Sequence, residues 1–138
     1  MNEESILAWN IIEKTSANLF LTGKAGTGKT TFLKQLKEKS PKRMVVLAPT
    51  GIAAINAGGM TIHSFFQLPF SPYIPGTTFG SGEQKRYQFS KLKRNIIRSI
   101  DLLVIDEISM VRSDLLDAID SVLRQYRKRH DLPFGGVQ

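Results

Sequence analysis

The sequence contains no cysteine, so the chain cannot form a disulfide, bind zinc through thiolates or use a cysteine nucleophile. Long apolar runs are missing too: the longest, residues 44–48, is far shorter than the roughly 20 residues of a membrane-spanning helix. The first residues are acidic and lack the apolar stretch of a signal peptide. We therefore expect a soluble intracellular domain, cytoplasmic if the source is bacterial, with no membrane partner.

The 138 residues suffice for one domain, and their hydrophobic and charged fractions, 41% and 22%, are those of a globular protein. Nineteen Lys and Arg residues against twelve Asp and Glu residues give a net charge of +7. This excess indicates a polyanionic partner such as nucleic acid, or a smaller anionic ligand, and composition does not choose between them.

The positive charges are concentrated in two places. Residues 84–99 contain six cations and no acid, within a segment that we predict to be helical from 83 to 99. We interpret it as a solvated helix face with Leu92, Ile96 and Ile97 turned inward, although its cations could also follow a phosphate backbone. The second group, between Arg124 and Arg129, is interpreted as surface that complements the dipole of the last helix.

Apolar segments alternate with helical ones, which is typical of βαβ units around a parallel sheet. The proline- and glycine-rich residues 67–82 are predicted to form an irregular insertion. The fold class is therefore α/β, a parallel sheet flanked by helices. We predict strands at 18–22, 44–48 and 101–106, and helices at 5–14, 29–38, 52–57, 83–99 and from an N-cap at Ser113 to about Tyr126, the last with Leu115, Leu116, Ile119, Val122, Leu123 and Tyr126 on its apolar face.

Residues 23–30, Gly-Lys-Ala-Gly-Thr-Gly-Lys-Thr, match the phosphate-loop pattern G-x-x-x-x-G-K-[ST]. Glycines let backbone N–H groups curl around phosphate oxygens, and the helix that follows points its positive end at the same phosphates. Lys29 would reach the β- and γ-phosphates, and the Thr30 hydroxyl would bind Mg²⁺. The expected cofactors are ATP and Mg²⁺, with the nucleotide held by Gly23, Ala25, Gly26, Thr27, Gly28, Lys29, Thr30 and Thr31.

The apolar run 102–105 ends in two acids, Asp106 and Glu107. A buried strand here would deliver Asp106 to the Mg²⁺ that Thr30 binds, and Glu107 would polarise an attacking water. The predicted metal ligands are thus Thr30 and Asp106, and the predicted catalytic residues are Lys29 and Glu107. Many strands end in exposed acids, so this assignment depends on the phosphate loop. A water-activating glutamate favours hydrolysis over phosphoryl transfer to a small acceptor.

Four segments together resemble the Pif (petite integration frequency) family of DNA helicases, which are RecD-like motors of superfamily one: GKAGTGKTTFL, LAPTGIAAINAGGMTIHSFF, LLVIDEISMV and PFGGVQ. The resemblance runs from about Leu19 to Gln138, and the two middle segments are its most specific part. It implies a P-loop NTPase with a RecA-like fold that moves 5′ to 3′ on single-stranded DNA. It also implies duplex or structured DNA as a partner, a monomeric full-length protein, and roles in DNA repair, recombination and telomere maintenance.

The resemblance assigns two segments to DNA binding. Thr50 and Gly51 fall in the first, at the start of a helix whose N–H groups face outward. His63, Ser64 and Phe65 fall in the second. From the residues alone, His63 would be an ordinary hydrogen-bonded histidine, and Phe65 and Phe66 would be core residues, of which only one could face a base.

Two departures from the family pattern stand out. Family members usually carry a glutamine near the N-terminus that reads adenine, whereas no glutamine precedes Gln35 here, so Trp9 or backbone groups would substitute. The family's next motif would begin just beyond Gln138. We therefore expect residues 1–138 to be the N-terminal part of the first RecA-like ATPase domain, without the second such domain and inactive alone. The alternatives are a P-loop phosphotransferase or regulatory ATPase, and a basic single-strand-binding domain with a vestigial phosphate loop.

Overall fold

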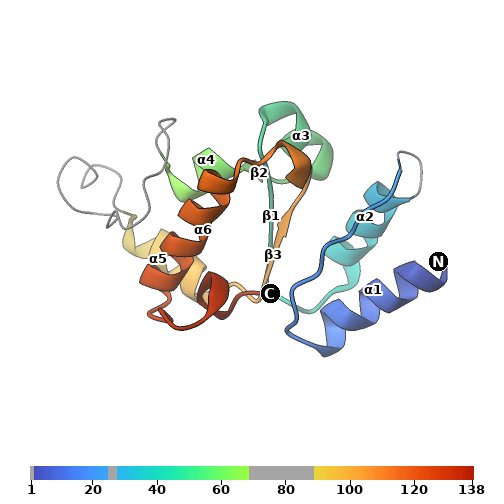
Figure 1. Ribbon diagram of the computed structural model, residues 1–138, viewed down its shortest axis with the longest axis horizontal. Coiled ribbons are helices and arrows are strands. Elements are labelled where there is room, and N and C mark those ends of the chain that lie inside the picture. The colour runs from blue at the N-terminus through green and yellow to red at the C-terminus, as the bar shows by residue number, and fades with distance from the viewer. Residues whose placement is uncertain (1, 25–27, 69–88) are drawn as a thin grey trace.

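The computed structural model describes residues 2–24, 28–68 and 89–138. A small parallel sheet stands in the middle, with α1 and α2 on one side, α4, α5 and α6 on the other, and α3 above its upper end (Figure 1). The predicted α/β class is confirmed. The elements are α1 (Glu3–Lys14), α2 (Lys29–Lys39), β1 (Met44–Ala48), α3 (Gly51–Ala57), β2 (Met60–Thr61), α4 (Ile62–Phe66), α5 (Lys91–Ser99), β3 (Leu102–Ile105), the 3₁₀ turn η2 (Ile108–Met110), α6 (Ser113–Tyr126) and the 3₁₀ turn η3 (Pro133–Gly136).

The strands lie in the order β2-β1-β3, and both pairings are parallel. Ala48 pairs with Thr61 and Leu47 with Ile105, so all three strands end at the same edge of the sheet. Gly59 permits the approach of β2 to β1, because a Cβ there would lie 2.1 Å from the Val46 carbonyl oxygen. The residues at the ends of the strands therefore emerge side by side at this carboxyl edge.

Each face of the sheet is covered by its own apolar cluster. On the α1 and α2 side, Phe32 and Leu36 are buried against Ala8 and Ile12, and the Trp9 ring meets the Phe32 ring edge-on at 6.0 Å. The larger cluster lies on the other side, where Ile119 and Leu123 of α6 are fully buried. Every residue of the predicted apolar face of α6 belongs to or packs on this cluster, which confirms that prediction.

The predicted strand at 18–22 is wrong. These residues are extended but belong to no strand, and the Phe20 side chain is 72% exposed. Among the described residues, none of them takes part in a backbone hydrogen bond. The free edge of β3 instead bonds Gln138, whose N–H donates to Asp101 O (3.3 Å) and whose carbonyl accepts from Leu103 N–H (2.8 Å). A segment becomes a strand only where it pairs with a partner edge, and within the described residues a pocket lies between residues 18–21 and β3.

Several smaller predictions also need correction. Ser113 is the first residue of α6 rather than its N-cap, which is Arg112. In α5, Leu92 is 71% exposed and Ile96 37%, so of the three expected inward residues only Ile97 is buried. Lys93 of the same helix is half-buried, with its Nζ over the Phe65 ring. Residues 83–88, and residues 69–82 of the predicted insertion, lie outside the described parts of the chain.

Arg127 is not the surface cation that we expected. Its Nη1 donates to the carbonyls of Ile97, Arg98 and Ile100 at 2.8, 3.0 and 3.1 Å, and its Nε donates to Gly135 O at 2.9 Å. Cations at a helix C-terminus satisfy carbonyls that lack a partner within the helix. Arg127 therefore fixes the end of α5 against η3.

Candidate nucleotide site and DNA-facing edge

The described end of the phosphate loop leads directly into α2. Gly28, the N-cap, has a φ of +93°, a backbone conformation that favours glycine. It makes no side-chain cap, and the first turn of α2 contains no acid. The N–H groups of this turn, with the positive end of the helix dipole, are thus directed at the loop.

The Lys29 Nζ donates to the carbonyl oxygen of Gly23 at 2.5 Å. The structure thus brings together the first residue of the motif and its lysine. Thr30 and Thr31 are exposed in the first turn of α2, as binding to a phosphate or a metal ion requires. Ala25, Gly26 and Thr27 lie outside the described residues, so their predicted role stays a prediction.

The two acids stand at the carboxyl end of β3, as predicted. The Asp106 N–H donates to Leu47 O at 2.8 Å, which ties this residue to the end of β1. Its Oδ1 accepts from the Glu107 N–H at 2.9 Å. Glu107 is exposed and has a φ of +53°, a left-handed conformation that costs a non-glycine residue about 1 kcal/mol. The turn from β3 into η2 imposes this conformation on Glu107.

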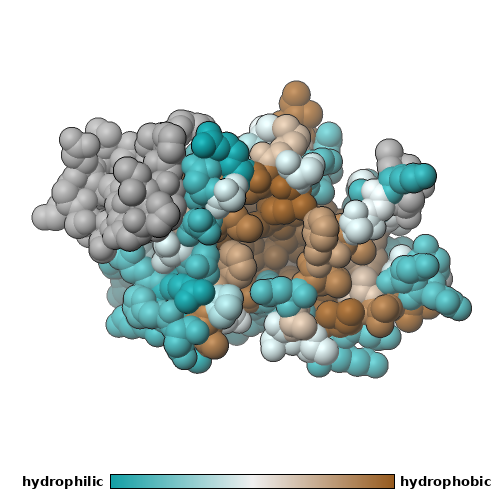
Figure 2. Space-filling view, viewed as in Figure 1, coloured by the Kyte–Doolittle hydropathy of each residue, from teal (hydrophilic) through white to brown (hydrophobic). Residues whose placement is uncertain are grey.

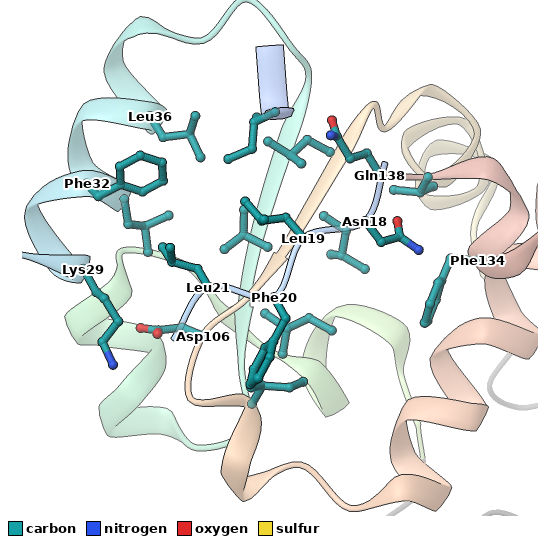
Figure 3. A pocket seen from close by; sticks show the side chains of 18 residues that line it. Asn18, Leu19, Phe20, Leu21, Lys29, Phe32, Leu36, Asp106, Phe134 and Gln138 are labelled. Atoms are coloured by element: carbon teal, nitrogen blue, oxygen red, sulfur yellow. The ribbon is translucent and has the colours of Figure 1, made fainter. Parts of the chain in front are cut away.

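Lys29 and Asp106 lie at the same end of an apolar pocket of about 290 Å³ (Figure 3). Residues 18–21 form one wall of the pocket and β3 forms the opposite wall, while Gln138 lies at the far end. In Figure 2 the pocket is the brown hollow near the centre of the face. The structure therefore brings the two halves of the predicted nucleotide site to one place.

Within the described ranges, no group of three or more His, Asp or Glu side chains could hold a metal ion. Mg²⁺ commonly takes only one or two protein ligands and completes its shell with phosphate and water oxygens. The Asp106 carboxylate, half-buried and oriented by the Glu107 N–H, and the exposed Thr30 hydroxyl fit such a site. These two residues would hold Mg²⁺ together with a nucleotide.

The predicted DNA-binding residues lie on the other part of the carboxyl edge. Thr50 and His63 each follow by two residues the paired positions Ala48 and Thr61, so both lie just beyond the carboxyl ends of neighbouring strands. Thr50 caps α3, its Oγ1 accepting from the Ala53 N–H at 3.2 Å. Gly51 and Ser64 are exposed. The edge thus runs from His63 through Thr50 to Asp106.

The prediction that Phe65 takes part in DNA binding by stacking on a base needs correction. Its side chain is only 4% exposed, and its ring packs edge-on against Phe66 at 4.9 Å. Lys93 Nζ lies 4.1 Å from the centre of the Phe65 ring, and burial lowers the pKa of Lys93. The short helix α4 turns Ile62, Phe65 and Phe66 into the core. A base cannot stack on the Phe65 ring here, and the alternative interpretation as a core residue is confirmed.

Sequence reasoning missed the exposed apolar side chains beside Thr50. Ile52 is 77% exposed and Ile55 80%, and both lie on α3. Nothing in the sequence signalled this, because an apolar pattern alone would bury the isoleucines; the structure shows that α3 buries its small residues Ala54 and Ala57 instead.

The comparisons with known proteins decide the family. The PIF1-like helicase family matches residues 3–138. The chain belongs to this family. A solved relative is Bacteroides Pif1 bound to single-stranded DNA, which is 52% identical over 99% of the chain with a TM-score of 0.87. The ATP-dependent DNA helicase PIF1 of Saccharomyces cerevisiae is 38% identical over 99% of the chain, and the Bdellovibrio bacteriovorus Pif1 helicase 38% over 91%.

The chain spans only part of these family members: 15% of the yeast protein, 27% of the Bdellovibrio protein and 30% of the Bacteroides chain. Bacteroides Pif1 has also been solved with ADP-AlF3 and single-stranded DNA, and the chain matches that structure with a TM-score of 0.88 at 52% identity. In the portion of the chain that the structure describes, no helix is long and apolar enough to cross a membrane.

Proposed function

We propose that the protein to which this chain belongs is an ATP-dependent DNA helicase that moves 5′ to 3′ on single-stranded DNA. The chain would be the N-terminal part of its first RecA-like domain. One observation supports the proposal most strongly: Lys29 of the phosphate loop and Asp106 at the end of β3 line one end of the same pocket. The Thr50 and His63 segments follow the carboxyl ends of the neighbouring strands. The relatives named above, including one solved with a nucleotide analogue and single-stranded DNA, support it.

ATP, held with Mg²⁺, supplies the phosphoryl group whose transfer to water releases the free energy used. Lys29 and the N–H groups at the start of α2 neutralise phosphate charge. Thr30 and Asp106 would hold Mg²⁺. Glu107 projects from the end of β3 into solvent, where its carboxylate can orient a water and accept its proton.

The hydrogen bonds of the sheet suggest how hydrolysis is coupled to DNA. The Asp106 N–H bonds the carbonyl of Leu47, and three residues further along the chain Thr50 begins the DNA-facing segment. Asp106 and Thr50 therefore belong to neighbouring strand ends joined by a backbone hydrogen bond. A shift of the Asp106 turn between nucleotide states would act on the backbone that leads to Thr50.

The test is ATP hydrolysis by the full-length protein with and without single-stranded DNA. We expect DNA to stimulate hydrolysis, and Lys29→Ala to abolish it while DNA binding is retained. Lys34→Ala, which removes an exposed lysine from the same helix, should behave like the wild type. An ATPase that is indifferent to DNA, or a Lys29→Ala variant that hydrolyses ATP at the normal rate, would refute the proposal.

A further inference from the structure

The side chain of Gln138 is buried at the end of the pocket far from Asp106, and its amide has three partners (Figure 3). Its Oε1 accepts from Lys42 Nζ at 2.6 Å. Its Nε2 donates to the carbonyls of Ala17 and Ile11 at 2.8 and 3.2 Å. One amide thus uses its acceptor and both of its donors within the protein.

Lys42 makes the second half of this network. Besides Gln138, its Nζ donates to the carbonyl of Thr15 at 2.9 Å and to the carbonyl of Ile12. These carbonyls lie at and just beyond the C-terminal end of α1, where a cation is favourable and where helix carbonyls lack partners. Gln138 and Lys42 together hold residues 11–17.

Both residues are also attached to the start of the sheet. The Gln138 backbone bonds Asp101 and Leu103 on the free edge of β3. Lys42 precedes Arg43, whose carbonyl accepts from the N–H groups of Asp101 and Leu102 at 2.9 and 3.1 Å. The network therefore fixes the stretch that ends at Ala17 to the amino ends of β1 and β3.

This attachment matters because the chain after Ala17 leads directly to the phosphate loop. Residues 18–22 reach Gly23 without a backbone hydrogen bond to any described residue. Six residue steps from Ala17 to Gly23 span about 20 Å when extended, and the five steps from Asp101 to Asp106 about 17 Å. A segment anchored beside Asp101 thus reaches the level of Asp106, and Lys29 and Asp106 line the same pocket at the end away from Gln138 (Figure 3).

We propose that Gln138 and Lys42 are positioning residues of the nucleotide site. They set the distance between the phosphate loop and the acids of β3 by holding the start of the segment that carries the loop. This inference rests on the proposed function only in taking residues 23–30 and Asp106 as the ATP site.

Two substitutions of Gln138 separate positioning from simple packing. Gln138→Met keeps the length of the side chain and removes all three hydrogen bonds. Gln138→Glu keeps an acceptor for Lys42 and could strengthen that contact, but places a carboxylate oxygen against the carbonyls of Ala17 and Ile11. If the donated hydrogen bonds hold the segment, the glutamate variant is defective although its ion pair is intact.

The experiment uses the full-length protein and measures ATP KM and kcat, equilibrium binding of a fluorescent ATP analogue without DNA, and the midpoint of thermal unfolding. We expect Gln138→Met, Gln138→Glu and Lys42→Met each to raise the ATP KM about tenfold, since small displacements of binding groups have effects of this order or larger. The kcat at saturating ATP should stay within about twofold, because binding energy then restores the geometry. Lys42→Arg should recover most of the affinity.

The double variant Lys42→Met, Gln138→Met should have an ATP KM no higher than that of the single variant with the higher KM, because the two residues act as one network. Lys39→Met, at the exposed end of α2, is the matched control and should leave the KM unchanged. A lowered unfolding midpoint with an unchanged KM and analogue affinity would show a purely structural role and overturn the inference. Analogue binding without DNA-stimulated hydrolysis in the wild type would refute the proposed function instead, and the analogue affinities of the variants would still decide the positioning role.

Discussion

The two edges of β3 differ in how they are held, and the candidate nucleotide site extends over both. Along one edge β3 pairs with β1 from Leu102 to Ile105, beside a core in which Leu47 is fully buried. Along the other edge Gln138 makes the backbone hydrogen bonds, and a pocket separates β3 from residues 18–21. Within the described residues, Asp106 is therefore tied to the sheet by a backbone hydrogen bond, whereas the segment that leads to the phosphate loop is held by the side chains of Gln138 and Lys42.

The largest effect on ATP turnover is expected at the carboxyl end of β3, which carries Asp106 and Glu107. In the full-length protein, Glu107→Gln should lower ATP turnover about 10³-fold because it removes the general base. Nucleotide binding should be retained, since Asp106 keeps its carboxylate. Asp106→Asn should instead weaken Mg²⁺-dependent nucleotide binding. Steady-state ATPase and equilibrium nucleotide binding test both variants, and an equal loss of binding would show that the two roles are misassigned.

Truncating one leucine on each side of β3 compares how much each side contributes to the free energy of unfolding. Leu47→Ala should lower the free energy of unfolding of the full-length protein by about 2–5 kcal/mol, the usual cost of truncating a fully buried leucine. Leu21→Ala should cost less than Leu47→Ala if residues 18–22 are packed in the full-length protein as they are within residues 1–138, where the Leu21 side chain is 39% exposed. Urea unfolding measures both values. Equal losses would mean that residues 18–22 are packed as firmly as β1.

The predicted DNA-binding part of the carboxyl edge, with Thr50 and His63, should respond separately from the nucleotide site. Thr50→Ala combined with His63→Ala should reduce single-strand affinity about tenfold, since a hydrogen bond to a charged group is worth about 1.5 kcal/mol or more. ATP affinity without DNA should stay near the wild-type value, because neither residue lines the pocket. Fluorescence anisotropy and ATPase assays measure the two effects.

Thr50→Ala also removes the N-cap of α3, so it needs a control that loses only a cap. Asn2→Ala removes the equivalent hydrogen bond from α1, where Asn2 Oδ1 accepts from the Ser5 N–H at 2.8 Å. That control should bind DNA normally. Unchanged DNA affinity in the Thr50 and His63 double variant would remove this edge from the DNA interface.

The smallest effect concerns backbone strain at Glu107. Glu107→Gly relieves its left-handed conformation, so the free energy of unfolding should stay the same or rise by up to about 1 kcal/mol. Turnover should be lost at the same time, because glycine supplies no carboxylate. Urea unfolding beside ATPase measurements would show activity and stability moving in opposite directions. A clear loss of stability would mean that the Glu107 side chain itself stabilises the turn.

Much of the site was predictable from short segments. The phosphate-loop pattern ends at a helix that starts with Lys29, and the apolar run 102–105 is a strand that ends at Asp106, because both depend on local chemistry. The face of α6 was predictable for the same reason, since helical periodicity alone selects it. The short elements β2 and α4 were not predicted, because two and five residues carry too little periodicity.

Other features depend on contacts between residues far apart in the sequence. The composition of residues 18–22 suits a strand, but a strand also needs a hydrogen-bonded partner, and among the described residues these five have none. From the sequence Phe65 could face either a base or the core. In the structure it is buried in the core, with Lys93 over its ring. Gln138 and Lys42 meet across 96 positions. The sequence by itself thus determined the chemical groups of the site and its main helices and strands, whereas only the tertiary structure decided which side chains position the phosphate loop, because hydrogen bonds and burial between distant segments leave no local pattern.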